Sequence, residues 1–172
     1  RQRQMCIRDR YLLDTKPLFG EQIAWGESNA VVYSNSVLGA RTQKYADYLD
    51  ICAAITGKAP MSGCHLNEER YGTIVLDVGS LSKDVILAEE NDEKSSNSNL
   101  DALFPLLGYM CGLKSESNVP VIIGLEEYSN ITLDDLKAFS AAFGSTASVP
   151  MFHMVGHTPE APSLNIALGG VD

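Results

Sequence analysis

The chain has 172 residues, 45% of them hydrophobic, with a mean hydropathy of −0.04, values typical of a globular domain with a sizeable core. Its formal net charge of −9 argues against nucleic acid or an anionic membrane surface as a partner. No apolar run approaches the ~20 residues that span a bilayer, and four cysteines without a CxxC pair favour the reducing cytoplasm over a disulfide framework.

Residues 1–10 fit no helix or strand and are set apart from the fold. Their sequence resembles the translation of an adaptor that contaminates some assembled sequences. A basic tail that binds a partner is the alternative. They carry four arginines and one aspartate, so the remainder of the chain carries a net charge of −12. A small anionic substrate would therefore need a local positive site.

A helix is predicted from Ser28, as N-cap, to Leu38, with Gly39 ending it in the left-handed conformation. One face of this helix is half polar, although its other positions are mostly apolar. The residues on that face are Asn29, Val32, Tyr33 and Ser36. Buried amides and hydroxyls need partners, so these groups either bond to neighbouring backbone or meet a ligand.

Both ends of this helix could hold an anion. Glu27, Ser28 and Asn29 lie where free backbone N–H groups and the helix dipole favour negative charge. Past the other end, Arg41 offers a carboxylate-binding fork and Thr42 a hydroxyl. Helix capping and a surface ion pair are the structural alternative, and residue types alone leave both open.

A second helix is predicted over 44–55, with Gly57 as its stop and Cys52 in the core. The segment 59–66 reads as a loop, in which Cys64 and His65 are interpreted as incidental residues because no other metal ligand stands at a suitable spacing. Arg70 could face a pocket or the solvent, and the sequence does not decide between them.

A β-branched run over 73–78 predicts a buried strand. The polar segment 83–99 is expected to contain a solvated surface loop or short insertion. A strongly apolar helix follows over 100–113, capped by Asn99 or Asp101 and loosened or ended at Gly112. The side chains expected in the core are Leu103, Leu106 or Leu107, Met110 and Cys111.

The last third predicts a buried strand over 120–125, a helix capped by Thr132 and ended by Gly144, and a strand over 149–155. The apolar side of that helix is expected to contain Leu133, Leu136, Phe139 and Phe143. Alternating strands and helices predict an α/β fold with a layered sheet of at least partly parallel strands flanked by helices. Ligand sites in such sheets lie at the carboxyl ends of strands, where residues 156–162 fall.

His153 and His157 have the spacing of a metal pair on a helix, but Gly156 and the following Thr-Pro favour strand and loop instead. For His153, general acid–base chemistry, substrate contact and a satisfied core histidine all stay open. The sequence contains no GxSxG elbow, P-loop or GxGxxG fingerprint.

Four long motifs resemble the aconitase X family of iron–sulfur hydro-lyases, in the same order. They are GEQIAWGESNAVVYSNSVLGART, KYADYLDICAAITGKAP, VPVIIGL and MFHMVGHTPEAP, and the resemblance extends from Tyr11 to Ala167. It implies that residues 11–172 are a fragment of the family's large catalytic domain, aconitase-like and incomplete.

The resemblance also implies an iron–sulfur cluster in the complete enzyme. Tyr11 matches the last residue of the family's Cys-Thr-Pro-Tyr stretch, which places Arg8 where a cluster cysteine stands, and Cys6 is not given that role. The other cluster cysteines are expected beyond Asp172, and the catalytic serine on a small swivelling domain or small subunit. No metal ligand is therefore assigned here, and the chain alone is expected to be inactive.

The function predicted is removal of water from a small anionic or zwitterionic hydroxy acid. The wording of EQIAW and KYADYLDIC favours cis-3-hydroxy-L-proline over mevalonate 5-phosphate, the family's other substrate. A non-catalytic α/β binding domain is the rival from another class. The residues expected to hold substrate and close the site are Glu27, Ser28, Asn29, Asn35, Ser36, Arg41, Thr42, His153, Thr158 and Glu160.

Overall fold

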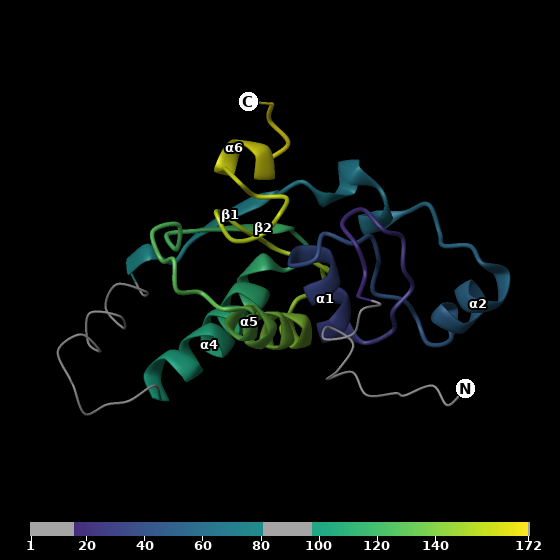
Figure 1. Cartoon of the computed structure of the whole chain (residues 1–172), viewed down its shortest axis with the longest axis horizontal. Coiled ribbons are helices and arrows are strands. Elements are labelled where there is room, and N and C mark those ends of the chain that lie inside the picture. The colour runs from purple at the N-terminus through teal and green to yellow at the C-terminus, as the bar shows by residue number, and fades with distance from the viewer. Residues whose placement is uncertain (1–15, 81–97, 172) are drawn as a thin grey trace.

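The structure, a computed structural model, describes residues 16–80 and 98–171 (Figure 1). The first ten residues and most of the polar segment 83–99 lie outside these ranges, so the expectations for them stay predictions. No helix within the described ranges is long and apolar enough to cross a membrane.

Three short strands form a parallel sheet in the order β1–β2–β3. These are β1 (Ile74–Asp77), β2 (Pro120–Ile123) and β3 (His153–Met154). Val121 on the central strand pairs with Val75 on one side and His153 on the other. Pro120, Val121 and Ile122 are all buried, as expected of a strand covered on both faces. The predicted α/β class is thereby confirmed.

The two outer strands differ from their predictions. β1 is not buried throughout, because Val75 is 41% exposed and the side chains alternate between half-buried and exposed. It pairs only with β2 among the described residues and is therefore an edge strand of the described sheet. The strand predicted over 149–155 is buried along its length, but only two of its residues pair with β2.

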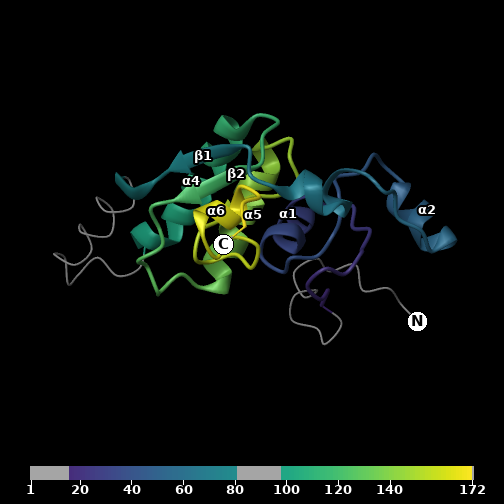
Figure 2. The same ribbon diagram turned by 90° about the horizontal axis from the view of Figure 1, so that it is seen from above.

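Two packed helices, α4 (Ser98–Ser115) and α5 (Leu133–Thr146), lie under the sheet (Figures 1 and 2). They approach closely at Gly108 and Gly112, where a Cβ would clash with the Phe139 carbonyl oxygen and with Thr146 of α5. Of the two alternatives predicted for Gly112, that it loosens or ends the helix, the second is wrong. Gly112 is a point of close packing, and the helix continues to Ser115.

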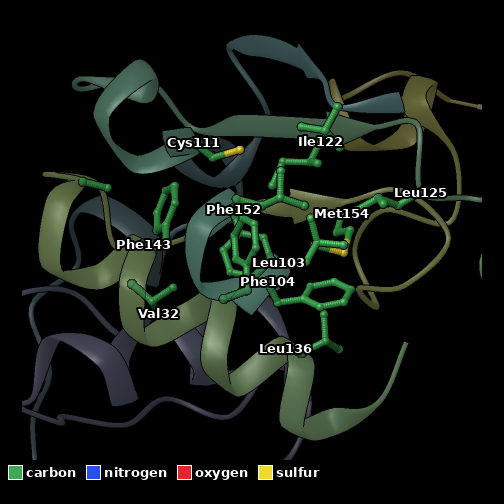
Figure 3. Packing of buried hydrophobic residues seen from close by; sticks show 14 of the residues in the cluster. Val32, Leu103, Phe104, Cys111, Ile122, Leu125, Leu136, Phe143, Phe152 and Met154 are labelled. Atoms are coloured by element: carbon green, nitrogen blue, oxygen red, sulfur yellow. The ribbon is translucent and has the colours of Figure 1, made fainter. Parts of the chain in front are cut away.

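The hydrophobic core fills the space between these helices and the sheet (Figure 3). Phe152, which precedes β3, meets Phe139 and Phe143 of α5 with ring centroids 4.6 and 5.5 Å apart. Offset and edge-to-face contacts of this kind add stability beyond the buried area.

On α4 the row that faces the core contains Leu103, Leu107 and Cys111, which confirms the core role of that cysteine. Of the two alternatives Leu106 and Leu107, the structure buries Leu107 and leaves Leu106 56% exposed. Met110 is 42% exposed, contrary to expectation. Leu133, at the first turn of α5, is also exposed, because it lies off the face that meets the core.

The start of α5 is a capping box, as its sequence predicts. The Asp135 backbone N–H donates to the Thr132 hydroxyl at 3.2 Å, and the Asp135 carboxylate accepts from the Thr132 N–H at 2.8 Å. Leu136, Phe139 and Phe143 are buried as expected. The helix continues two residues beyond the predicted stop at Gly144, to Thr146.

Helix α1 (Ser28–Ser36) packs against α5. Ser28 is its first helical residue and Glu27 occupies the N-cap without a side-chain cap bond, so the predicted cap is displaced by one position. The helix ends before Leu38, and Gly39 is left-handed with φ +68, as predicted. Residues 30–36 are all buried, so α1 is an interior helix whose polar side chains need partners.

Helix α2 (Leu49–Thr56) lies far from the sheet (Figure 2) and buries none of its residues. It starts five residues later than predicted, after Tyr48 in a left-handed conformation, and Gly57 ends it as expected. Cys52 is exposed, so its predicted core position is wrong. Periodicity correctly identified a helix here, but no described residues cover its apolar side.

Candidate active site

A buried ion cluster joins three segments that are distant in the sequence. One Glu160 oxygen, Oε1, lies 2.7 Å from Arg41 Nη2, and the other, Oε2, accepts from Arg70 Nε at 2.9 Å and from Arg70 Nη2. Arg41 follows α1, Arg70 ends the 3₁₀ turn η3 (Asn67–Arg70), and Glu160 lies in the loop after β3. Buried charges require such pairing, because an isolated charge would be strongly disfavoured in the interior.

Arg70, for which the sequence left pocket and solvent open, is 2% exposed. Its terminal nitrogens donate to the Asn35 side-chain and main-chain oxygens at 3.1 and 2.9 Å and to the Cys64 carbonyl at 3.0 Å. With the bonds to Glu160, all five N–H groups of this guanidinium are engaged. Arg70 therefore ties α1, the loop before η3 and the loop after β3 into one unit.

Asn35 is the most connected polar side chain of α1. Its amide donates to the Thr42 and Pro150 carbonyls, both at 3.0 Å, and its Oδ1 accepts from the Thr42 N–H at 3.0 Å. These contacts hold the segment after α1 against the residues that lead into β3. The Thr42 hydroxyl is fully buried and has no hydrogen-bond partner within the described ranges.

Ser36 and Thr158 also engage the main chain. The Ser36 hydroxyl accepts from the Phe152 N–H at 2.9 Å. The Thr158 hydroxyl accepts from the Met154 N–H at 3.0 Å and donates to the carbonyl of the same residue at 3.1 Å. Both side chains fix β3 and its loop, and neither lines the cavity described next.

A cavity of about 330 Å³ opens beside the ion cluster. Its wall combines charged, polar and apolar groups, which suits a small polar ligand. The lining residues are Phe19, Arg41, Asn67, Arg70, Tyr71, His153, Pro159, Glu160, Pro162, Ile166 and Ala167.

The position of this cavity differs in part from the expectation based on strand ends. The loop 156–162 does contribute to the wall, as expected. Arg70 and Tyr71, however, come from the segment that enters β1, and His153 is the first residue of β3, so the wall also includes residues near the amino ends of strands.

His153 is 3% exposed, and its Nε2 lies 2.7 Å from the Arg70 carbonyl oxygen. Burial lowers the pKa of this imidazole, and the Arg70 carbonyl and the Glu160 charge offset only part of that effect. His157 does not join it: its ring Nε2 contacts the Leu125 carbonyl at 2.8 Å. No group of three potential metal-ligating side chains occurs within residues 16–80 and 98–171.

The opposite end of α1 does not reach this cavity. Glu27, Ser28 and Asn29 begin the helix, and about eight residues at ~1.5 Å per residue separate them from its far end. The Asn29 side chain accepts from the Ala30 N–H at 2.7 Å. Their role in substrate binding stays a prediction.

Cys64 and His65 are not incidental loop residues, because both are buried in the 3₁₀ turn η2 (Gly63–His65). His65 bonds through its two ring nitrogens to Gln22 and Tyr45, and it lines a second cavity of about 260 Å³. Burial raises the pKa of the Cys64 thiol to about 11, so this thiol is protonated at neutral pH.

Sequence reasoning found Arg41, His153 and Glu160 and the structure brings all three to one cavity. It did not find Asn67 or Tyr71, and it left Arg70 undecided. No spacing in the sequence links Arg70 to Glu160, which lie 90 residues apart.

Both parts of the chain match known protein families. A family model described as the aconitase X first domain matches residues 2–68, and one described as the aconitase X second domain matches residues 76–172. The chain therefore belongs to the aconitase X family.

Its relatives are dehydratases. The chain is 50% identical over 160 residues to the cis-3-hydroxy-L-proline dehydratase of Pseudomonas aeruginosa, covering 93% of this chain and 25% of that protein. The chain is 48% identical over 159 residues to the enzyme of the same name from Hypocrea jecorina, and the match covers 92% of this chain and 24% of that protein. The phosphomevalonate dehydratase large subunit of Thermococcus kodakarensis is 36% identical over 144 residues, with 84% and 32% covered. The chain thus spans about a quarter to a third of the length of these relatives.

A solved structure supports the fold. The crystal structure of Thermococcus kodakaraensis aconitase X in its holo-form superimposes with a TM-score of 0.71 at 32% identity. The match covers 91% of this chain and 36% of that chain. The α/β arrangement described here is therefore one part of a larger aconitase X fold.

Proposed function

We propose that this chain forms the carboxylate-binding part of a hydro-lyase that removes water from cis-3-hydroxy-L-proline. The observation that carries the proposal is Arg41, a buried guanidinium in a cavity wall that keeps two N–H groups unpaired within the described ranges. Higher identity to the hydroxyproline enzymes than to a phosphomevalonate dehydratase supports the choice of substrate.

Elimination of water from a hydroxy acid requires a fixed cationic donor near the substrate carboxylate. Water loss begins with removal of a proton alpha to the substrate carboxylate, and negative charge then develops on the carboxylate oxygens. Fixed donors directed at that charge stabilise it without reorganisation in a site that excludes water. Arg41 would bind the carboxylate and also stabilise this charge.

His153 would contact the substrate from the same wall. Its Nε2 faces a carbonyl, which can only accept, so Nε2 carries the proton and Nδ1 presents a lone pair. Because burial lowers its pKa, the ring is neutral at pH 7. We assign His153 to orienting the substrate or accepting a proton from it.

We propose that most of the other residues predicted from the sequence hold the cavity in shape. Asn35, Ser36 and Thr158 hold the backbone around the cavity, and Thr42 and Glu160 flank Arg41 in sequence or in space. Glu27, Ser28 and Asn29 would reach substrate only through a second pocket, formed with parts of the complete enzyme.

The family resemblance implies an iron–sulfur cluster, and the described residues do not fit one. Residues 16–80 and 98–171 present no group of three metal-ligating side chains. We propose that cluster ligands come from other parts of the complete enzyme, and that the complete enzyme works in the cytoplasm, where thiols stay reduced.

A small subunit or small swivelling domain is the proposed partner. The Thermococcus relative is called a large subunit, and the present chain covers about a third of it. This chain alone is proposed to be inactive.

The test is an assay of the complete enzyme, expressed from the uninterrupted gene with its small partner. We expect water loss from cis-3-hydroxy-L-proline and none from mevalonate 5-phosphate. Activity on mevalonate 5-phosphate alone would favour the alternative substrate. Activity on neither, in protein loaded with its cofactor, would overturn the proposal and favour a non-catalytic binding domain.

A further inference from the structure

The Arg41–Glu160 ion pair has unused hydrogen-bonding capacity on the cavity wall. Arg41 Nε donates to Asn67 at 3.1 Å, Nη1 to the Gly39 carbonyl at 2.7 Å, and Nη2 to Glu160. A guanidinium has five N–H groups, so one on each terminal nitrogen has no partner among residues 16–80 and 98–171. The centroid of the Phe19 ring lies 5.4 Å from the Arg41 guanidinium carbon, within the range of a cation–π contact.

Glu160 has the complementary capacity. Its Oε2 accepts two N–H groups from Arg70, whereas its Oε1 accepts one, from Arg41. An ionised carboxylate offers about four acceptor positions, so one on Oε1 is left without a partner from the described part of the chain, next to the spare donors of Arg41. The side chain is 16% exposed, which leaves this oxygen within reach of a ligand in the cavity.

We propose that this ion pair binds the zwitterionic head of an α-imino or α-amino acid, with the carboxylate on Arg41 and the ammonium on Glu160 Oε1. In such a head group the carboxylate and the ammonium are bonded to the same carbon. The two protein atoms that would receive them, Arg41 Nη2 and Glu160 Oε1, lie 2.7 Å apart. This inference rests on the proposed function and adds a specificity residue to it: Glu160 distinguishes a charged ring nitrogen from a neutral ring atom.

The carboxylate of the ligand would meet the excess positive charge of the wall. Two guanidiniums and one carboxylate leave one positive charge, which a substrate carboxylate neutralises. The ammonium then needs its own acceptor, since an unpaired charge in a buried site is costly. Arg70 holds Glu160 in place and has no N–H left for a ligand, so it is a positioning residue.

Three ring carboxylates test the inference on the complete wild-type enzyme by isothermal titration. L-Proline carries the ammonium, tetrahydrofuran-2-carboxylate replaces it with a neutral ring oxygen, and cyclopentanecarboxylate replaces it with carbon. We expect L-proline to bind at least about tenfold more tightly than the other two, the effect of one charge-assisted hydrogen bond. This comparison requires no variant and so does not depend on how a variant folds.

Variants locate the effect. Glu160→Gln should weaken L-proline at least about tenfold more than it weakens cyclopentanecarboxylate, whereas Arg41→Lys should weaken both ligands to a similar extent. Glu160→Asp is the substitute variant if Glu160→Gln does not fold. It keeps the negative charge but moves it away from the ligand by one methylene, and it should weaken L-proline selectively. Glu68→Gln is the control: it removes the same negative charge at an exposed position and should alter the binding of neither ligand.

The outcomes separate the two proposals. Equal binding of all three ligands by the wild type, or equal weakening of all three in Glu160→Gln, would overturn the zwitterion site and leave the carboxylate site standing. Binding of none of the three would overturn the carboxylate site itself. Selective loss of L-proline binding in the Glu160 variants supports both.

Discussion

His153 and Arg70 are joined by a hydrogen bond from the imidazole Nε2 to the Arg70 main-chain oxygen, 2.7 Å long. The side chain of the same arginine binds Glu160, which also lines the cavity. One residue thus fixes the histidine through its backbone and the carboxylate through its guanidinium. The rigidity of the proposed site depends on Arg70 more than on any residue that would contact substrate.

Arg70→Lys should destabilise the protein by about 2–4 kcal/mol, because three donors on a flexible stem replace five in a planar fork and leave buried oxygens without partners. Urea unfolding measures this loss. In a double-mutant cycle with Glu160→Gln the two changes should couple by more than about 1 kcal/mol. Additive losses would show that the ion pair does not connect these segments.

Acid should destabilise the fold through its buried histidines. Burial lowers the pKa of His153 and of His65, so the unfolded chain binds more protons than the folded chain below the ordinary histidine pKa of about 6.5. Their contribution to stability is complete above that pKa and is lost as the pH falls through the lowered values. His153→Gln should reduce the slope of unfolding free energy against pH between about pH 7 and 5. An unchanged slope would contradict the burial argument.

Gly108→Ala should destabilise the protein by about 1–3 kcal/mol, although alanine is the better helix former by about 1 kcal/mol. The added Cβ would clash with the Phe139 carbonyl and force α4 away from α5. Lys114→Ala, an exposed change on the same helix, should stay within about 0.5 kcal/mol of the wild type. A stabilising effect of Gly108→Ala in thermal unfolding would show that the helices are not in close contact there.

Thr132→Ala should cost about 1 kcal/mol, because the Asp135 N–H loses its cap acceptor at the start of α5. Thr132→Ser keeps the hydroxyl and should restore most of that loss. If both variants unfold at the same urea concentration as the wild type, the capping box does not stabilise the helix.

Local signals in the sequence predicted much of the fold. Gly39 and Gly57 end their segments in the left-handed conformation, the Thr132 cap forms, and the apolar face of α5 contains the expected residues from Leu136 to Phe143. Each of these features depends on residues within one or two turns of each other, so the sequence carries them directly.

What the sequence did not predict depends on tertiary contacts. Periodicity placed Met110 and Cys52 on apolar faces but could not say which face meets the core, and both are exposed. Arg70 was undecided for a related reason: its partners Asn35, Cys64 and Glu160 come together only after the sheet and α1 are in place.

The role proposed for Arg41, binding of the substrate carboxylate, is tested by kcat/KM of Arg41→Lys and Arg41→Met in the complete enzyme. Loss of a buried charge-assisted contact costs about 2–5 kcal/mol, so we predict kcat/KM for cis-3-hydroxy-L-proline to fall at least about 30-fold, further for Met than for Lys. Folded variants with the kcat/KM of the wild type would contradict the account.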